Sequence, residues 1–126
     1  MARKRKIPPK WAMRQRELIS LMNRTATLFA DRYTRSDGTL KWRESWMGMD
    51  GTDNGYEIFL PYPLFYLLGG GDHVHQLAQK EWDAITWQFT SYGTVDREFV
   101  GYFDWFHHSE SYTYLFYLGL ADPYHY

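Results

Sequence analysis

Three consecutive glycines, Gly69 to Gly71, interrupt the chain near its middle and limit what can form on either side. Glycine loses more conformational freedom on folding than any other residue, so a run of three ends a helix. The apolar segment before them, 56–68, contains Pro61 and Pro63, which forbid a regular helix through its middle. We therefore predict a short turn of helix followed by a helix that begins near Pro63.

Helical periodicity marks three further segments. Residues 11–33 carry an apolar stripe with a 3.6-residue period, and residues 73–92 carry another that ends at Gly93. A last helix is predicted over 107–118, and almost no segment shows the alternation of a strand. The pattern therefore predicts an all-α fold of helical hairpins. The expected core residues are Leu18, Leu21, Met22, Thr25, Leu28 and Phe29 in the first of these helices, and Leu77, Trp82, Ile85, Phe89 and Tyr92 in the second.

The net charge of -1 hides an uneven distribution. Residues 1–35 carry ten Lys and Arg against two acids, whereas residues 36–126 carry four against thirteen. We interpret residues 1–10 as a basic disordered arm and residues 11–126 as one helical-hairpin domain. The acidic body argues against a nucleic-acid partner, since phosphates would be repelled. The chain has no cysteine and no apolar run of membrane-spanning length, so we expect no membrane partner and a cytoplasmic location.

A short internal repeat connects two parts of the chain. The tetrapeptide Leu64–Leu67 recurs as 115–118, and an aspartate stands eleven positions before each copy, at Asp53 and Asp104. An offset of about fifty residues fits a helical hairpin whose first helix is buried and whose second is amphipathic. Both aspartates then lie in loops that lead into buried helices.

Three segments carry a resemblance to a known group of proteins: residues 48–57, residues 63–69 and residues 104–110. Together they resemble the six-hairpin (α/α)6 toroid superfamily, which contains many glycoside hydrolases and polysaccharide lyases. The resemblance implies a partial toroid, with the chain as the N-terminal part of a longer protein. It also implies that the loops at Asp53 and Asp104 line a substrate cleft. No glycosidase motif is matched residue for residue, so the resemblance assigns no catalytic residue.

The residues themselves suggest one catalytic pair in the first loop. Asp53 and Glu57 share a helix face if a helix begins near Asn54. Two neighbouring carboxylates push their pKa values apart, and glycosidic cleavage needs one acid and one base. The alternative is structural, with Asp53 as a helix cap and Asp50 as a turn residue.

The second loop offers further candidates for proton transfer, namely Asp104, His107, His108 and Glu110. Adjacent histidines on a helix diverge by about 100°, and no zinc spacing is present, so we predict no metal site. The alternative here is that Ser109 or Asp104 caps the helix.

Aromatic side chains beside acids suggest where a ligand would lie. Sugars stack on aromatic faces while carboxylates accept hydrogen bonds from hydroxyl groups. We expect Trp82 and Trp87 to be core residues of the outer helix. The predicted substrate-binding residues are Trp42, Trp46, Asp50, Tyr102 and Trp105.

These observations favour a carbohydrate-active, glycoside hydrolase-like protein that binds a saccharide or another small polar ligand and needs no cofactor. One alternative is a non-catalytic helical-repeat binding or interaction protein. Another is a polysaccharide lyase-like enzyme, which the scarcity of Lys and Arg in residues 36–126 disfavours. An isolated chain of this length would expose apolar helix faces, so self-association is also expected.

Overall fold

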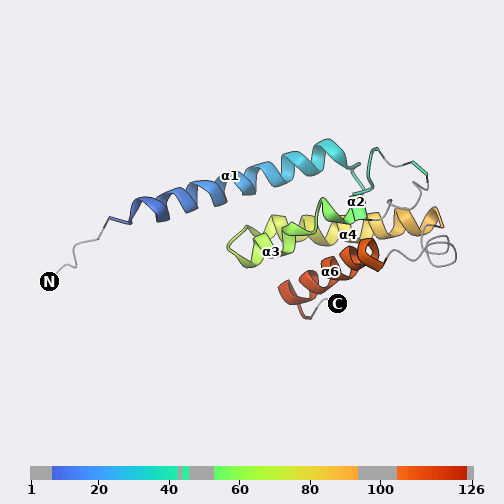
Figure 1. Ribbon diagram of the computed structural model, residues 1–126. Helices are drawn as coiled ribbons and strands as arrows, with labels where there is room; N and C mark the ends of the chain where they lie inside the picture. The colour runs from blue at the N-terminus through green and yellow to red at the C-terminus, as the bar shows by residue number, and fades with distance from the viewer. Residues whose placement is uncertain (1–6, 43, 46–52, 94–104, 125–126) are drawn as a thin grey trace.

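The computed structural model describes residues 7–42, 44–45, 53–93 and 105–124, with the backbone alone for residues 53, 54 and 105–109 (Figure 1). Within these residues the extended structure is limited to one antiparallel bridge, between Thr34 and Leu40. The predicted all-α class is confirmed. The helices are α1 (Lys10–Tyr33), α2 (Asp53–Glu57), α3 (Pro61–Leu67), α4 (Asp72–Ser91) and α6 (Trp105–Ala121).

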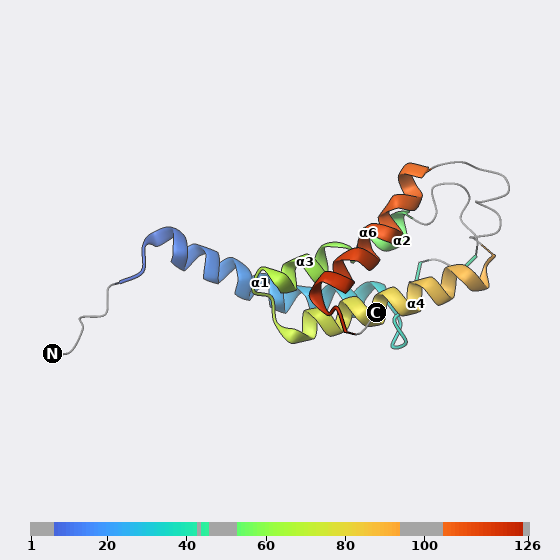
Figure 2. The same ribbon diagram turned by 90° about the horizontal axis from the view of Figure 1, so that it is seen from below.

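Helix α4 is the central element of the bundle. Helices α1, α2, α3 and α6 all pack against it, and α6 also runs along α2 and α3. The N-terminal half of α1 projects beyond the other helices in both views (Figures 1 and 2). Residues 1–6, and with them most of the predicted arm, lie outside the described residues.

Aromatic rings dominate the core between α4, α6 and the α2–α3 segment. Tyr56 packs edge-on against Phe89 and Tyr114, with ring centroids 5.6 and 6.4 Å apart. Such edge-to-face pairs contribute about 0.5–1.5 kcal/mol beyond the area they bury. The buried Tyr114 hydroxyl donates a hydrogen bond of 2.8 Å to the carbonyl oxygen of Ala78. The α4 prediction is confirmed here: Ile85 and Phe89 are fully buried, and Leu77, Trp82 and Tyr92 pack against the same cluster.

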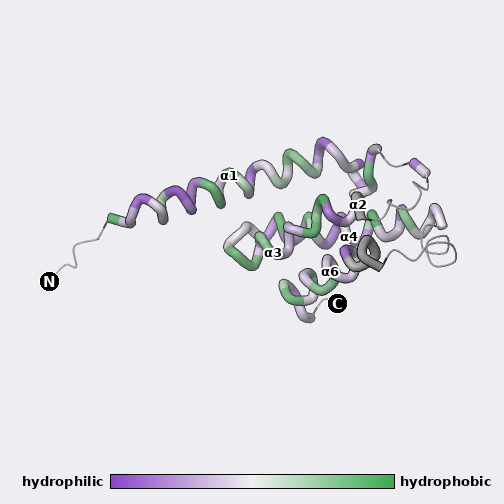
Figure 3. Tube along the Cα trace, viewed as in Figure 1, coloured by the Kyte–Doolittle hydropathy of each residue, from purple (hydrophilic) through white to green (hydrophobic). Residues whose placement is uncertain are grey.

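The predicted core face of the first helix is wrong. All six residues of that stripe are exposed, and the buried residues of α1 are Ala26 and Ala30. Small side chains let α1 approach α4 closely, so alanines carry this contact and the larger residues stay outside it. Figure 3 shows the isolated apolar positions between hydrophilic ones along α1. The Tyr62 hydroxyl donates to the Ala26 carbonyl oxygen at 3.1 Å, and burial, aided by the charge of Glu81, raises the pKa of Tyr62 to about 12.

The sequence repeat does not produce two equivalent structures. The segment from Asp53 to the end of the first copy is divided between α2 and α3 because Pro61 begins a new helix, whereas the second copy lies within the single helix α6. Phe65 is buried in the first copy, but the matching Phe116 is 62% exposed. Helix α6 also continues through Gly119, its predicted end. The toroid therefore stays a prediction.

The loop from Thr34 to Ser45 lies close against α4 at Gly38. Gly38 has φ of +92°, a left-handed conformation that L-residues with a side chain rarely adopt. A Cβ atom at this position would lie 2.8 Å from the Cβ of Ala84 and 3.3 Å from the Lys80 carbonyl oxygen. Both the conformation and the contact with α4 therefore require glycine.

Gly38→Ala should lower the free energy of unfolding more than Gly69→Ala does. Gly69 has a similar φ of +107° but no atom within 4 Å of an added Cβ, so its variant reports backbone strain alone, about 1–2 kcal/mol. The clash with Ala84 should add about 1–3 kcal/mol to the loss at Gly38. Urea unfolding followed by circular dichroism measures both values, and equal losses would show that the loop does not press on α4.

Candidate functional site

One exposed face of α4 brings polar side chains and a tryptophan together beside the loop after α1. Lys80, Asp83, Trp87 and Ser91 follow one another at intervals of three or four residues, so they lie on the same side of the helix. Trp87 is 66% exposed. We call the surface formed by Lys80, Asp83 and Trp87 of α4 with Asp37 and Thr39 of the adjoining loop the Trp87 face.

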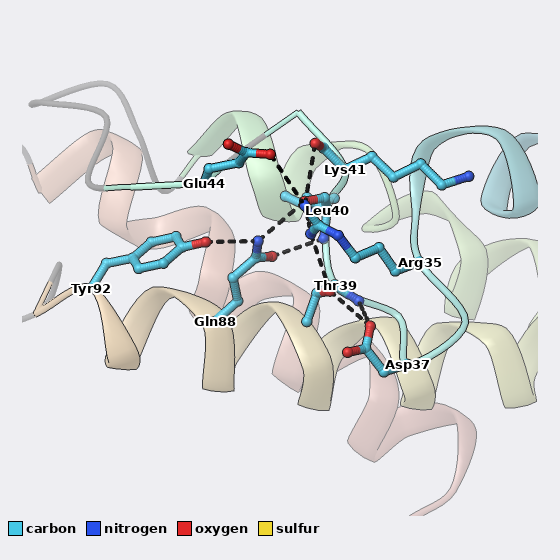
Figure 4. Close-up of polar contacts among 8 residues, drawn as sticks. All are labelled: Arg35, Asp37, Thr39, Leu40, Lys41, Glu44, Gln88 and Tyr92. Carbon is cyan, nitrogen blue, oxygen red and sulfur yellow. Dashed lines mark hydrogen bonds and ion pairs between the residues drawn. The ribbon is translucent and has the colours of Figure 1, made fainter.

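Gln88 attaches the loop to this helix. Its side-chain Oε1 accepts a hydrogen bond of 2.8 Å from the Leu40 N–H, and its Nε2 donates one of 3.1 Å to the Leu40 carbonyl oxygen (Figure 4). Nε2 also donates to the Tyr92 hydroxyl at 3.1 Å. The amide thus satisfies the N–H of a fully buried residue, which would otherwise cost about 1–3 kcal/mol, and it also donates to the carbonyl oxygen of that residue.

Arg35 and Asp37 stabilise the rest of the loop. The Arg35 guanidinium donates to the Leu40 carbonyl oxygen at 2.7 Å and forms an ion pair of 3.7 Å with Glu44 (Figure 4). The Asp37 carboxylate accepts from the backbone N–H and the hydroxyl of Thr39, at 2.9 and 2.7 Å. The hydrogen bond from the Thr39 backbone, followed by the one from its hydroxyl, holds the pKa of Asp37 below its usual range. The charge of Arg35 adds to this lowering. Asp37 therefore remains a carboxylate.

Two adjoining hollows open on this surface. One, of about 460 Å³, is lined by the Trp87 face and Ala84. The other, of about 330 Å³, lies on the side of Arg35, Glu44 and Tyr92, and the two share Asp37, Thr39 and Trp87. An exposed indole ring flanked by carboxylates and a hydroxyl can stack on a ligand ring and accept hydrogen bonds from its hydroxyl groups.

A buried carboxyl group lies beneath the loop. Glu81 is fully buried; its Oε1 accepts a long hydrogen bond of 3.4 Å from the Thr34 hydroxyl and lies 4.0 Å from the Lys80 ammonium. Among the described residues its Oε2 has no hydrogen-bond partner. Burial raises the pKa of Glu81 to about 7, against the lowering effect of Lys80. Gly38 packs over this oxygen, so Glu81 does not reach the surface.

The predicted catalytic residues belong to a different part of the molecule. Asp53 and Glu57 lie on α2, where Glu57 is exposed, and α2 packs against α6. Helix α6 carries His107 and His108, whose side chains are not described, and Glu110, which is half-buried. The structure thus brings the two candidate segments side by side but gives no geometry for the reacting groups. Outside the described residues lie Asp104, Asp50, Trp46 and Tyr102.

The tryptophans of the predictions lie in different places. Trp42 is 39% exposed and lines another hollow, with Arg32 and Lys41, and its role in binding stays a prediction. Trp105 begins α6, and its side chain is not described. The prediction that Trp87 is a core residue is wrong. Trp87 stands two residues from both Ile85 and Phe89, about 200° around the helix from each, and that spacing would have shown its exposure.

The described residues contain no group of three or more His, Asp or Glu side chains that could hold a metal ion. In the same part of the chain, no helix combines the length and apolar character needed to cross a membrane. The family described as "Domain of unknown function (DUF8034)" matches residues 2–126, so the chain belongs to this family. Comparison with the curated proteins found no match, and comparison with the solved structures found none either.

The buried Glu81 should make stability depend on pH. Its pKa is about 7 in the folded chain, and we take the ordinary value of 4.5 for the unfolded chain. Between these pH values the folded state therefore binds more protons than the unfolded state. The stabilisation is complete below pH 4.5 and is lost as the pH rises through about 7, by at most about 3 kcal/mol. Glu81→Gln should flatten this decline in urea unfolding across the range, with the exposed Glu57→Gln as the matched control. An unchanged slope in Glu81→Gln would contradict the assignment.

Proposed function

We propose that this member of the family binds a small polyhydroxylated ligand of the saccharide class on the Trp87 face. The observation that carries the proposal is the exposed Trp87 ring beside Asp37 and Asp83 in a hollow of about 460 Å³. Aromatic rings provide stacking surfaces for the apolar faces of sugars, and carboxylates accept hydrogen bonds from their hydroxyl groups. The volume lies within the range of about 300–1,000 Å³ that is usual for small-ligand sites.

The face is held in place before any ligand arrives. Three of its side chains project from one rigid helix, and the loop that supplies the other two is attached to that helix through Gln88 and Gly38. Sites on helices hold their geometry better than sites on free loops. A ligand would therefore lose little binding energy to ordering the protein.

The charges of the face favour a neutral ligand. Asp37 stays ionised and lies with Asp83 against a single cation, Lys80. An anionic ligand such as a phosphate would meet net repulsion, whereas a sugar hydroxyl meets two acceptors.

Binding without hydrolysis is the role that fits this face. Glycosidic cleavage needs a protonated carboxyl group in contact with the leaving oxygen. The carboxyl group here whose pKa lies near neutrality is Glu81, which is sealed beneath Gly38. This reading corresponds to the non-catalytic binding alternative rather than to the hydrolase.

A glycoside hydrolase-like activity is the second candidate, and the packing of α2 against α6 supports it. That contact places the segments of Asp53 and Glu57 beside the segment of His107, His108 and Glu110. Acids and bases from the two segments would then share one site, as the proposed toroid requires.

Trp87→Ala should weaken saccharide binding about tenfold or more, since it removes the stacking surface. Screening on a glycan array identifies the ligand, and titration calorimetry of the best glycan gives the affinity. Trp87→Phe should retain most of the binding because it keeps a ring.

The matched control is Trp11→Ala, a residue 69% exposed on the projecting half of α1. Equal losses in Trp87→Ala and Trp11→Ala, or no glycan bound by the unaltered chain, would refute the proposal.

The hydrolase candidate predicts that Asp53→Asn and Asp104→Asn each abolish release of reducing sugar from a glycan panel. Trp87→Ala should affect this activity less than either change, because the Trp87 face belongs to the loop and α4. Activity that survives both Asn variants would remove these carboxylates from the reaction.

A further inference from the structure

A second surface lies along α1, on the apolar stripe that was predicted to be buried. Met22, Thr25, Ala26 and Phe29 occupy one stripe of α1, and Tyr62 and Phe65 of α3 face them across a hollow of about 250 Å³. Its lining is mostly apolar, and Met22 and Phe29 are 39% and 38% exposed. Exposed apolar side chains around a hollow offer a surface on which an apolar ligand group can be removed from water.

A second hollow adjoins the first toward the C-terminal end of α1 and has a different character. Phe29 and Ile58 also border this second hollow of about 540 Å³, whose other walls are Arg32, Tyr33, Lys41 and Trp42. From Met22 to Tyr33 the stripe covers about 16 Å of helix. We call the two hollows together the α1 groove. It has an apolar part and an aromatic part that carries two cations.

The two cations at the end of the groove are held in position. The Lys41 ammonium donates hydrogen bonds to the carbonyl oxygens of Asp31 and Arg32, at 2.6 and 3.2 Å, in the last turn of α1. The Arg32 guanidinium lies 5.8 Å from the centre of the Tyr33 ring. Neither cation forms an ion pair with a carboxylate among the described residues, so their charge is left for another partner.

We infer that the α1 groove binds an anionic amphiphile, with an alkyl body along Met22, Phe29 and Phe65 and a carboxylate head at Arg32 and Lys41. The apolar part would remove the alkyl chain from water, and the cations would offset the charge of the head. A neutral apolar ligand would leave both cations unused, and a cationic amphiphile would be repelled. This ligand differs in charge from the one proposed for the Trp87 face.

Titration calorimetry with decanoate, below its micelle concentration, tests the inference on the full chain. Decan-1-ol has the same tail without a charge, and decyltrimethylammonium carries the opposite charge. Decanoate should bind more tightly than both. The double variant Arg32→Gln/Lys41→Met should weaken decanoate about tenfold and leave decan-1-ol unchanged. Lys10→Met/Arg16→Gln makes the same charge change on the projecting half of α1 and should have no effect.

The apolar part has its own variant. Met22→Glu places a carboxylate where the alkyl chain would lie and should abolish decanoate binding, whereas Leu28→Glu alters an exposed residue of α1 that does not line the groove. Equal binding of the three amphiphiles would overturn the inference, as would decanoate binding that survives the double variant. A dimer in sedimentation that Met22→Glu disrupts, without decanoate binding, would assign the groove to a second copy of the chain instead.

Discussion

The paired hydrogen bonds between the Gln88 amide and the backbone of Leu40 determine how the loop after α1 lies. They allow Leu40 to be fully buried, because Gln88 satisfies its N–H and shares its carbonyl oxygen with Arg35. A side chain of α4 here forms the backbone hydrogen bonds that a neighbouring strand would form in a sheet. Once Leu40 is fixed, Asp37 and Thr39 lie beside Trp87 on one side of the loop, and Gly38 lies over Glu81.

The same loop separates two surfaces of opposite chemistry. The Trp87 face carries carboxylates, whereas the α1 groove ends in Arg32 and Lys41. Figure 4 shows the Lys41 side chain pointing away from Gln88. Neighbouring residues of this short segment contribute to the two surfaces, Asp37 and Thr39 to one and Lys41 to the other.

The helices were predictable because glycine, proline and apolar periodicity act locally: α1 and α4 begin and end within one residue of the predicted ranges. The buried face of α1 was not predictable, because periodicity identifies an apolar stripe but not whether another element packs against it. Alanines, which carry little periodic signal, make the contact instead. The candidate site on α4 was not predicted for a related reason. Gln88 and Gly38 gain their roles from residues that are distant in sequence, and Trp87 was grouped with the core by residue type rather than by its angle on the helix.

The packing of Gly38 over Glu81 should also affect how fast the Glu81 carboxyl group exchanges its proton with solvent. Glu81 is fully buried and Gly38 packs against its Oε2, so we expect water to reach this oxygen when the loop separates from α4. Exchange of the Glu81 proton with solvent is then gated by opening of the loop. The rate of protonation after a pH jump would therefore report how often the hydrogen bonds between Gln88 and Leu40 break and the loop moves away from α4.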